Sequence, residues 1–214
     1  MTPGRTVLLT GFAPFGGDAQ NPSGDAVRRV AENWTGPERL VTAILPVTFA
    51  GAVAELARLC AAHEPDLVLA TGLAGGRRAI GVERIAVNLV DARIPDNDGM
   101  QPIDRPSREG AEAAVFASVP VKAIARSVAD AGIPCEVSLS AGTFVCNHVF
   151  FHAAMWARAH GRRAGFVHVP WATGQAPGEE FTLPPADIAR AIGIAVRTAL
   201  DVAEDPAVVG GALH

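Results

Sequence analysis

Lysine is almost absent from this chain of 214 residues. Lys122 is the only one, and it follows Val121. A phosphate-binding GxxxxGK loop needs a lysine directly after a glycine, so the sequence contains no such loop. An enzyme that works through a lysine Schiff base would have to use Lys122. The scarcity of lysine therefore removes one large class of nucleotide-binding proteins and leaves one candidate for imine chemistry.

The chain also lacks an excess of positive charge and any long apolar run. It carries 18 Lys and Arg against 22 Asp and Glu, a net charge of −4, which argues against a nucleic-acid partner held by a basic face. No segment approaches the roughly 18 apolar residues that a membrane span requires. The apolar stretch near the N-terminus is too short for a signal peptide. We therefore expect no nucleic-acid or membrane partner.

Cysteines are few and odd in number: Cys60, Cys135 and Cys146. Such a set does not build a disulfide framework, so we expect a reducing, cytoplasmic compartment. The chain is 49% hydrophobic and 19% charged, which is typical of a globular protein. With a domain prior of roughly 150 residues, one domain over residues 1–214 is favoured. We expect the tail after Asp205 to be loosely held.

Short apolar segments alternate with longer amphipathic ones along the chain. This alternation predicts a three-layer α/β/α sandwich with a twisted, mostly parallel but mixed central sheet. A polar stretch with three prolines, residues 91–110, is expected to be a functional loop or a disordered one. We expect strands at 7–10, 41–47, 67–70, 84–88 with its flanks, 136–139 and 165–169. We expect helices from Pro22 past Val30 and at 49–60, 120–131, 145–159 and 185–203.

Cys146 is the best candidate for a nucleophile. Ligands of open α/β sheets bind beyond the carboxyl ends of the strands, and Cys146 lies in such a position, in the segment AGTFVCNH. A cysteine in the first turn of a helix is near the positive end of the dipole, which favours its thiolate. The backbone N–H groups there are also suited to an oxyanion. The alternative is a small buried packing residue.

His168 and Glu83 are the candidates for a base and for a group that orients it. His168 ends an apolar strand, where a side chain reaches the active edge, although a core histidine with a satisfied hydrogen bond fits as well. Strict alternation places Glu83 on the same strand face as Ile85 and Val87. A carboxylate on an apolar face needs a partner, either a catalytic histidine or a buried arginine.

Other familiar sites find little support. His148 and His152 have the spacing of a zinc pair, but Val149 stands where an HExxH motif carries glutamate, so we expect no metal. The sequence has no GxSxG elbow and no GxGxxG fingerprint. We interpret its glycine-rich segments, such as residues 72–78, as tight turns close to a ligand.

Several long motifs together resemble the type I pyroglutamyl peptidases, also called pyrrolidone-carboxylate peptidases. They are TGFAPFGG followed by NPS, then GLAGGR and VERIAVNLVDARIPDNDGMQPID, and finally IPCEVSLSAGTFVCNHVFF followed by AGFVHVPW. The resemblance implies a cytosolic cysteine exopeptidase that hydrolyses the N-terminal pyroglutamyl residue from peptides through a thioester. It places the catalytic residues at Cys146, His168 and Glu83. It implies no cofactor, and a homotetramer or homodimer.

The same resemblance implies a substrate pocket. Its residues match Phe12, Phe15, Asn21, Leu73, Phe144 and Val145, and Arg93 matches a supporting position near the catalytic centre. Two positions depart from the family pattern. Leu73 stands where many bacterial members carry glutamine, and Gly81 where serine or threonine is usual. An amidase acting on another small cyclic or acyl amide, or a silent binding protein of the same fold, remains the alternative.

Overall fold

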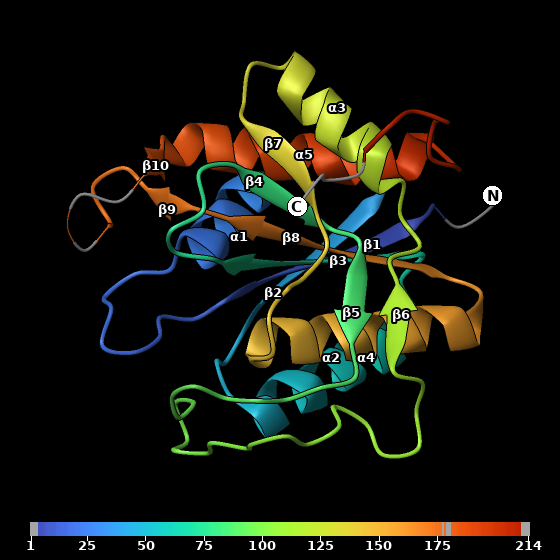
Figure 1. Cartoon of the computed structure of the whole chain (residues 1–214). Coiled ribbons are helices and arrows are strands. Elements are labelled where there is room, and N and C mark those ends of the chain that lie inside the picture. Colours follow the sequence, from blue (N-terminus) through green and yellow to red (C-terminus); the bar gives the residue numbers. More distant parts are fainter. Residues whose placement is uncertain (1–3, 177, 179–180, 211–214) are drawn as a thin grey trace.

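A central six-stranded sheet forms the middle layer of the molecule, with helices on both faces (Figure 1). The computed structural model describes residues 4–176, 178 and 181–210. In sheet order, the strands are β2 (Arg39–Leu45), β1 (Thr6–Phe12), β3 (Leu67–Leu73), β8 (Arg163–Val169), β4 (Ile80–Glu83) and β7 (Cys135–Ser138). The helices are α1 (Pro22–Glu32), α2 (Phe49–His63), α3 (Val121–Asp130), α4 (Val145–His160) and α5 (Pro185–Asp201). This confirms the predicted α/β architecture.

The sheet is mixed at one place only among the described strands. Strands β2, β1, β3 and β8 pair in parallel, and β4 pairs with β7 in parallel but with β8 in antiparallel orientation. Strands β1, β3 and β8 are covered on both faces, which is why they read as almost continuous apolar runs in the sequence.

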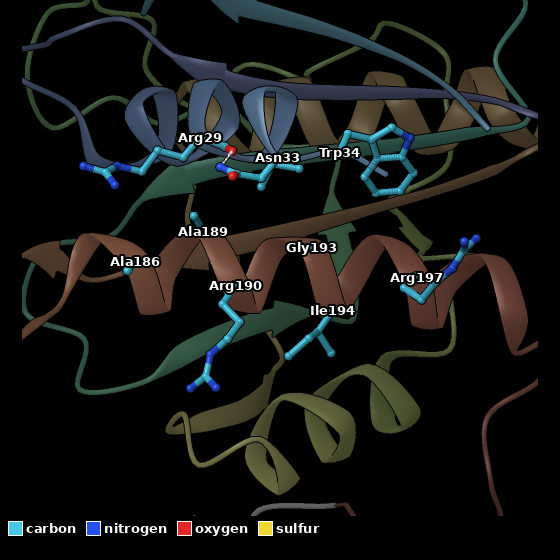
Figure 2. A pocket seen from close by; sticks show the side chains of 10 residues that line it. Arg29, Asn33, Trp34, Ala186, Ala189, Arg190, Gly193, Ile194 and Arg197 are labelled. Atoms are coloured by element: carbon cyan, nitrogen blue, oxygen red, sulfur yellow. Dashed lines mark hydrogen bonds between the residues drawn. The ribbon is translucent and has the colours of Figure 1, made fainter. Parts of the chain in front are cut away.

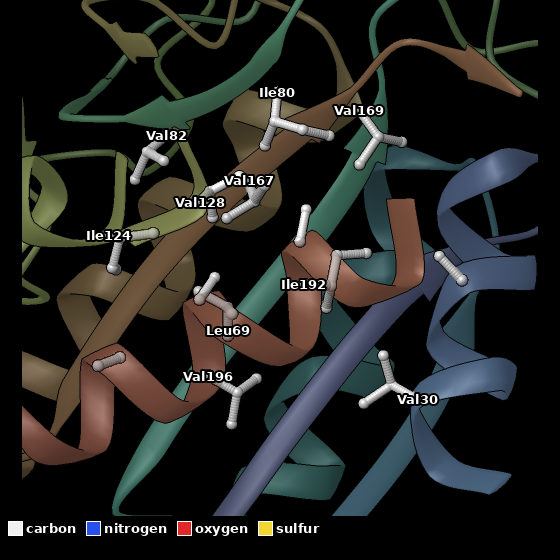
Figure 3. Packing of buried hydrophobic residues seen from close by; sticks show 14 of the residues in the cluster. Val30, Leu69, Ile80, Val82, Ile124, Val128, Val167, Val169, Ile192 and Val196 are labelled. Atoms are coloured by element: carbon white, nitrogen blue, oxygen red, sulfur yellow. The ribbon is translucent and has the colours of Figure 1, made fainter. Parts of the chain in front are cut away.

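Each face of the sheet has its own helical layer. Helices α1, α3 and α5 cover one face, where Leu69 and Val167 pack toward Ile192 and Val196 of α5 (Figure 3). Helices α2 and α4 cover the other face, where Phe166 packs against Phe150 of α4. Side chains alternate along a strand, so β8 sends Val167 to the first layer and Phe166 and His168 to the second. The site therefore belongs to the α4 side.

The strand expected at 84–88 with its flanks is two separate strands. Strand β4 ends at Glu83, and β5 (Ile85–Val87) pairs with β6 (Ala114–Phe116) in a separate two-stranded sheet beside α4. The backbone of Arg84 turns between them, donating to Ser138 O at 2.8 Å and accepting from Ala117 N at 2.9 Å. The prediction that Glu83 shares a strand face with Ile85 and Val87 was wrong, because it assumed one uninterrupted strand.

The polar stretch 91–110 is an ordered loop. Its carboxylate Asp96 is buried and accepts hydrogen bonds from the backbone N–H groups of Phe49, Asp98 and Met100, at 2.8–2.9 Å. An isolated bridge joins Val90 to Arg105. The loop is therefore tied to the start of α2 and to itself.

The remaining strands are β9 (Trp171–Ala172) and β10 (Thr182–Leu183), which form a small parallel pair after β8. At the other end, Asp205 accepts hydrogen bonds from the backbone of Lys122 and Ala123, at the start of α3. The final part of the expected loose tail, 211–214, lies outside the described residues. No helix in the described ranges is long and apolar enough to cross a bilayer.

Candidate active site

His168 stands between two glycines in the central sheet. The register places Gly72 of β3 on one side of it and Gly81 of β4 on the other. Residues opposite each other in a sheet project from the same face, so both lateral places beside the imidazole lack a side chain. Other groups fill the space. A Cβ on Gly72 would lie 2.7 Å from the sulfur of Cys146, and one on Gly81 would overlap Nη1 of Arg77.

Glu83 is fully buried and joins two partners through a single oxygen. Its Oε1 lies 2.7 Å from His168 Nδ1 and 2.8 Å from Arg77 Nη2. With Nδ1 bonded to a carboxylate, Nε2 is the ring nitrogen that remains to exchange a proton. The sequence left open a histidine or an arginine as the partner of this carboxylate, and the structure has both.

Cys146 is the second residue of α4 and is only partly buried. The helix begins at Val145, as predicted, and its N-cap Phe144 makes no side-chain hydrogen bond to the first turn. Thiol and imidazole border one cavity, so the fold brings together Cys146 from α4, His168 from β8 and Glu83 from β4.

The protonation of the site is set mainly by burial. Burial raises the pKa of the Cys146 thiol to about 12, and the charge of Glu83 adds to this while that of Arg77 opposes it. Burial lowers the pKa of His168, against the hydrogen bond to Glu83, which raises it. The pair therefore rests as a neutral thiol and a neutral imidazole.

This corrects the expectation that the helix start would make Cys146 acidic. At this position the desolvation of a thiolate is more unfavourable than the first turn of the helix is favourable. Burial raises the pKa of Cys60 and Cys135 to about 12 as well. Position distinguishes Cys146 from the other cysteines, because it alone of the three lines the cavity that holds His168.

Two cavities meet at Cys146. The smaller, the phenylalanine cavity, has a volume of about 150 Å³, and the larger, the histidine cavity, about 370 Å³. Leu73, Phe144 and Cys146 are walls of both. The phenylalanine cavity is completed by Phe12, Phe15, Asp18, Gln20, Asn21 and Val47. The histidine cavity is completed by Ala74, Arg77, Ser140, Ala141, Gly142 and His168.

The aromatic wall is held by ring contacts. The Phe144 ring lies 5.3 Å from that of Phe15 and 5.2 Å from that of Phe49, measured between centroids. Asn21 also lines the phenylalanine cavity, but its side-chain amide already makes hydrogen bonds within the protein. It caps α1, accepting from Ser23 N at 3.1 Å, and donates to Ala13 O at 2.9 Å.

Two of the pocket residues implied by the resemblance lie elsewhere. Val145 does not line either cavity, because the first turn of α4 directs its side chain into the core, where it is fully buried. Arg93 is exposed and borders a neighbouring hollow of about 540 Å³ together with Asp18, Phe144 and Trp171, apart from the thiol and the imidazole.

Sequence reasoning missed two residues that organise the site. Arg77 lies in the glycine-rich turn expected near a ligand, and only the buried carboxylate hinted at such an arginine. Asn147, next to Cys146, accepts from Val87 N at 3.0 Å and donates to the carbonyls of Val87 and Leu89 at 2.8 and 3.1 Å. It fastens β5 to the start of α4.

Other features of the molecule offer no chemistry of this kind. A hollow of about 460 Å³ between α1 and α5 is lined by Trp34, Arg29, Arg190 and Arg197, and no cysteine or histidine borders it (Figure 2). His148 and His152 have rings 4.8 Å apart, and Nδ1 of His148 lies 2.7 Å from the Ser107 hydroxyl. Within the described ranges, no group of three or more potential ligands is placed to hold a metal ion.

Comparison with known proteins gives a consistent result. Residues 5–205 match the family described as pyroglutamyl peptidase. The pyrrolidone-carboxylate peptidase of Erwinia tasmaniensis is 43% identical over 213 residues, covering 98% of this chain and all of the relative. That of Chromobacterium violaceum is 45% identical over 215 residues, again 98% and 100%.

Solved structures agree in fold. Pyroglutamyl peptidase I of Bacillus amyloliquefaciens superposes with a TM-score of 0.92 at 39% identity, covering 96% of this chain and all of that one. The pyrrolidone carboxyl peptidase of Thermococcus litoralis gives 0.88 at 40% identity, covering 92% and 94%. Full-length similarity in sequence and in fold shows that this chain belongs to the pyroglutamyl peptidase family.

Proposed function

We propose that Cys146, His168 and Glu83 are the triad with which this cysteine peptidase removes an N-terminal pyroglutamyl residue from peptides. The observation that carries the proposal is the buried bond between His168 Nδ1 and Glu83 Oε1, 2.7 Å long, in a site where Cys146 lies between two cavities. Such a constellation is the pattern of nucleophile, base and orienting group.

The two cavities divide the substrate at its scissile bond. The phenylalanine cavity receives the pyroglutamyl ring, because the lactam carries no charged amine and suits apolar walls. The histidine cavity receives the rest of the peptide, because the leaving nitrogen must take a proton from His168. Cys146 borders both and is placed to attack the carbonyl between them.

The first half of the reaction forms a thioester. His168 Nε2 takes the thiol proton as the Cys146 sulfur bonds to the carbonyl carbon, and backbone N–H groups of the first turn of α4 stabilise the oxyanion. When the intermediate collapses, the C–N bond breaks and Nε2 returns the proton to the leaving amine. Glu83 holds the ring and balances its transient charge.

Water completes the cycle. The oxygen of the water attacks the thioester carbon while His168 takes one of the water's protons. The C–S bond then breaks. The proton returns to sulfur, free pyroglutamate leaves, and the neutral thiol is restored. Because burial raises the pKa of the Cys146 thiol, the attack needs a base to take the thiol proton, and His168 is placed to serve as that base.

Recognition of the lactam requires hydrogen bonds to its N–H and C=O. Leu73 supplies none from its side chain, so these bonds fall to Gln20, Asp18 and backbone groups around the phenylalanine cavity. A site built on such bonds rejects a ring without the lactam carbonyl by a large factor, because its own polar groups are then left unpaired.

The test is the release of a fluorescent aminocoumarin from its pyroglutamyl amide, with the prolyl amide as the control. Turnover of the pyroglutamyl amide alone, stopped by a thiol reagent, is the expected result. Turnover of both amides would favour a broader amidase. Turnover of neither by the folded, reduced protein would favour a silent binding protein, and Leu73→Gln would then be the first change to try.

Homodimers or homotetramers are expected from the resemblance, and light scattering on the purified protein measures the mass directly. A reducing, cytoplasmic setting is expected because the nucleophile must stay a free thiol, and Cys60, Cys135 and Cys146 are all free. Localisation of a fluorescently tagged chain in its native cell tests this.

A further inference from the structure

We propose that Arg77 is a positioning residue of this site. Its guanidinium fills the space over Gly81, forms an ion pair with Glu83 and thereby holds the imidazole of His168 in its orientation. The inference rests on the proposed triad. It adds Arg77, which acts through Glu83, and Gly81, whose missing side chain leaves space for the guanidinium of Arg77.

The guanidinium joins two separate parts of the site. Nη2 of Arg77 lies 2.8 Å from Glu83 Oε1 and donates to Ser140 O at 3.0 Å. Ser140 belongs to the segment between β7 and α4, just ahead of the nucleophile. Arg77 therefore links the orienting carboxylate of β4 to the backbone that leads into Cys146.

Glu83 has little else to hold its charge. Its Oε1 is shared by His168 and Arg77, and its buried Oε2 has no hydrogen-bond partner in the part of the chain that is described. A fully buried carboxylate without a compensating charge is strongly unfavourable and would turn or take up a proton. Either change weakens the bond that orients His168.

Gly81 is what admits the arginine. A Cβ at this position would overlap Nη1 of Arg77 and lie 3.3 Å from its Cζ. The resemblance leads one to expect serine or threonine here, so the arrangement depends on a residue in which this chain departs from the pattern. Gly81 also lies in register with His168, so the guanidinium stands directly beside the imidazole.

The charge of Arg77 also reaches the reacting pair. The groups that face His168 are Glu83 from β4, Arg77 from the β3–β4 turn and Cys146 from α4, with the apolar Phe166 beside the ring. Arg77 lowers the pKa of both His168 and Cys146. Removing it should nevertheless move the acid limb of the kcat/KM profile to lower pH. The bond from Glu83 raises the pKa of His168 by more than the charge of Arg77 lowers it, and that bond weakens when Arg77 is lost.

The experiment compares Arg77→Ala and Arg77→Lys with Arg78→Ala, on the pyroglutamyl aminocoumarin amide. Arg78 is the matched control, since it is the next residue, carries the same charge and is exposed, 5.9 Å from the Phe181 ring. For Arg77→Ala we expect kcat to fall about 10- to 100-fold with KM changed less than about threefold. Arg77→Lys should restore part of kcat, and Arg78→Ala should match the wild type.

Gly81→Ala provides an independent arm in which Arg77 is still present. The added methyl displaces the guanidinium, so we expect a similar fall in kcat and a similar shift of the acid limb. Both changes break the same contact, between Arg77 and Glu83. The double variant should therefore have a kcat no lower than that of Arg77→Ala. Thermal unfolding of each variant checks that it is folded. If Arg77→Ala does not fold, the two single variants Gly81→Ala and Arg77→Lys are compared with the wild type instead.

The outcomes separate this inference from the proposed function. Wild-type kcat and an unmoved pH profile in Arg77→Ala would overturn the positioning role while Cys146→Ala remained inactive. Strict additivity of the Arg77 and Gly81 changes would also overturn it. Normal turnover by Cys146→Ala would instead remove the triad itself.

Discussion

Gly72 and His168 are direct neighbours across β3 and β8, and the sulfur of Cys146 occupies the space that a side chain on Gly72 would take. The sheet thus leaves a gap of one side chain beside His168, and Cys146 enters it from a helix of another layer. The closeness of thiol and imidazole depends on this gap.

Gly72→Ala should therefore disable the enzyme without unfolding it. Its Cβ would lie 2.7 Å from the sulfur and 3.0 Å from the Phe166 ring, so the thiol must move. A displacement near 1 Å costs about 100-fold in rate, which steady-state kinetics would measure.

The matched control for that change is Gly193→Ala on α5, where an added Cβ meets nothing within 4 Å. It should keep full activity and gain about 0.5–1 kcal/mol in the free energy of unfolding, from helix propensity. Equal activity in the two alanine variants would contradict the role given to Gly72.

Cys146→Ala should abolish turnover, since no other sulfur borders the described cavity with His168. Its melting temperature should stay close to that of the wild type, because the thiol is only partly buried and forms no disulfide. Cys135→Ala is the control and should retain activity. Activity left in Cys146→Ala, above that of a blank, would refute the assignment.

Alkylation by iodoacetamide should depend steeply on pH. With burial raising the pKa of Cys146 to about 12, the thiolate fraction grows about tenfold for each pH unit between 7 and 9. Mass spectrometry of the modified peptide measures the rate at this cysteine alone. A rate that levels off near pH 7 would mean that the thiolate is already formed at rest.

Phe144→Ala should weaken substrate binding more than it slows the chemistry. The ring is a wall of both cavities and packs against the rings of Phe15 and Phe49, whereas the bond between His168 and Glu83 does not involve it. We expect KM for the pyroglutamyl amide to rise about 10-fold or more, because the substrate ring then buries less apolar surface. Leu139→Ala, on an exposed side chain, is the control. An unchanged KM would argue against the ring's position in this pocket.

The stability of the fold should fall in mild acid because of His148. Burial lowers the pKa of His148 to about 4, with the neighbouring His152 adding to the effect, whereas the unfolded value is 6.5. Below pH 6.5 the unfolded chain binds a proton that the folded chain does not, so stability is lost as the pH falls from 6.5 toward 4. By pH 5 the loss from this group is about 2 kcal/mol.

Thermal unfolding at pH 7.5 and pH 5 measures this, with His148→Asn as the variant that should flatten the dependence. His160→Asn is the control, since His160 is exposed and bonds only to the carbonyl of Trp156 among the described groups. The same drop between the two pH values in wild type and His148→Asn would show that other groups cause it.

Much of the fold follows from local patterns in the sequence. The start of α1 could be predicted because Asn21 caps it and Pro22 fits its first turn. The strands β1, β3 and β8 were evident from apolar runs, which arise when helices cover both faces of a sheet. The first and last residues of these strands differ from the prediction by up to three positions. Backbone pairing continues a strand through residues that are not apolar, such as Thr71 and Gly72 in β3.

What could not be predicted depends on contacts between distant segments. The break at Arg84 is set by hydrogen bonds to Ser138 and Ala117, which no local pattern reveals. Burial decides the pKa of Cys146, and burial at a helix start is a property of the packed fold. Val145 shows the same limit, because its place next to Cys146 in the sequence says nothing about the direction of its side chain.

The size of the phenylalanine cavity has a consequence for where a peptide is cut. At about 150 Å³ it is the smaller of the two cavities that meet at Cys146, and its size suits one small ring. In the proposed mode of binding, a peptide places only its first residue on that side of Cys146. We therefore expect the shape of this cavity to favour cleavage after the first residue of a peptide over cleavage at interior positions.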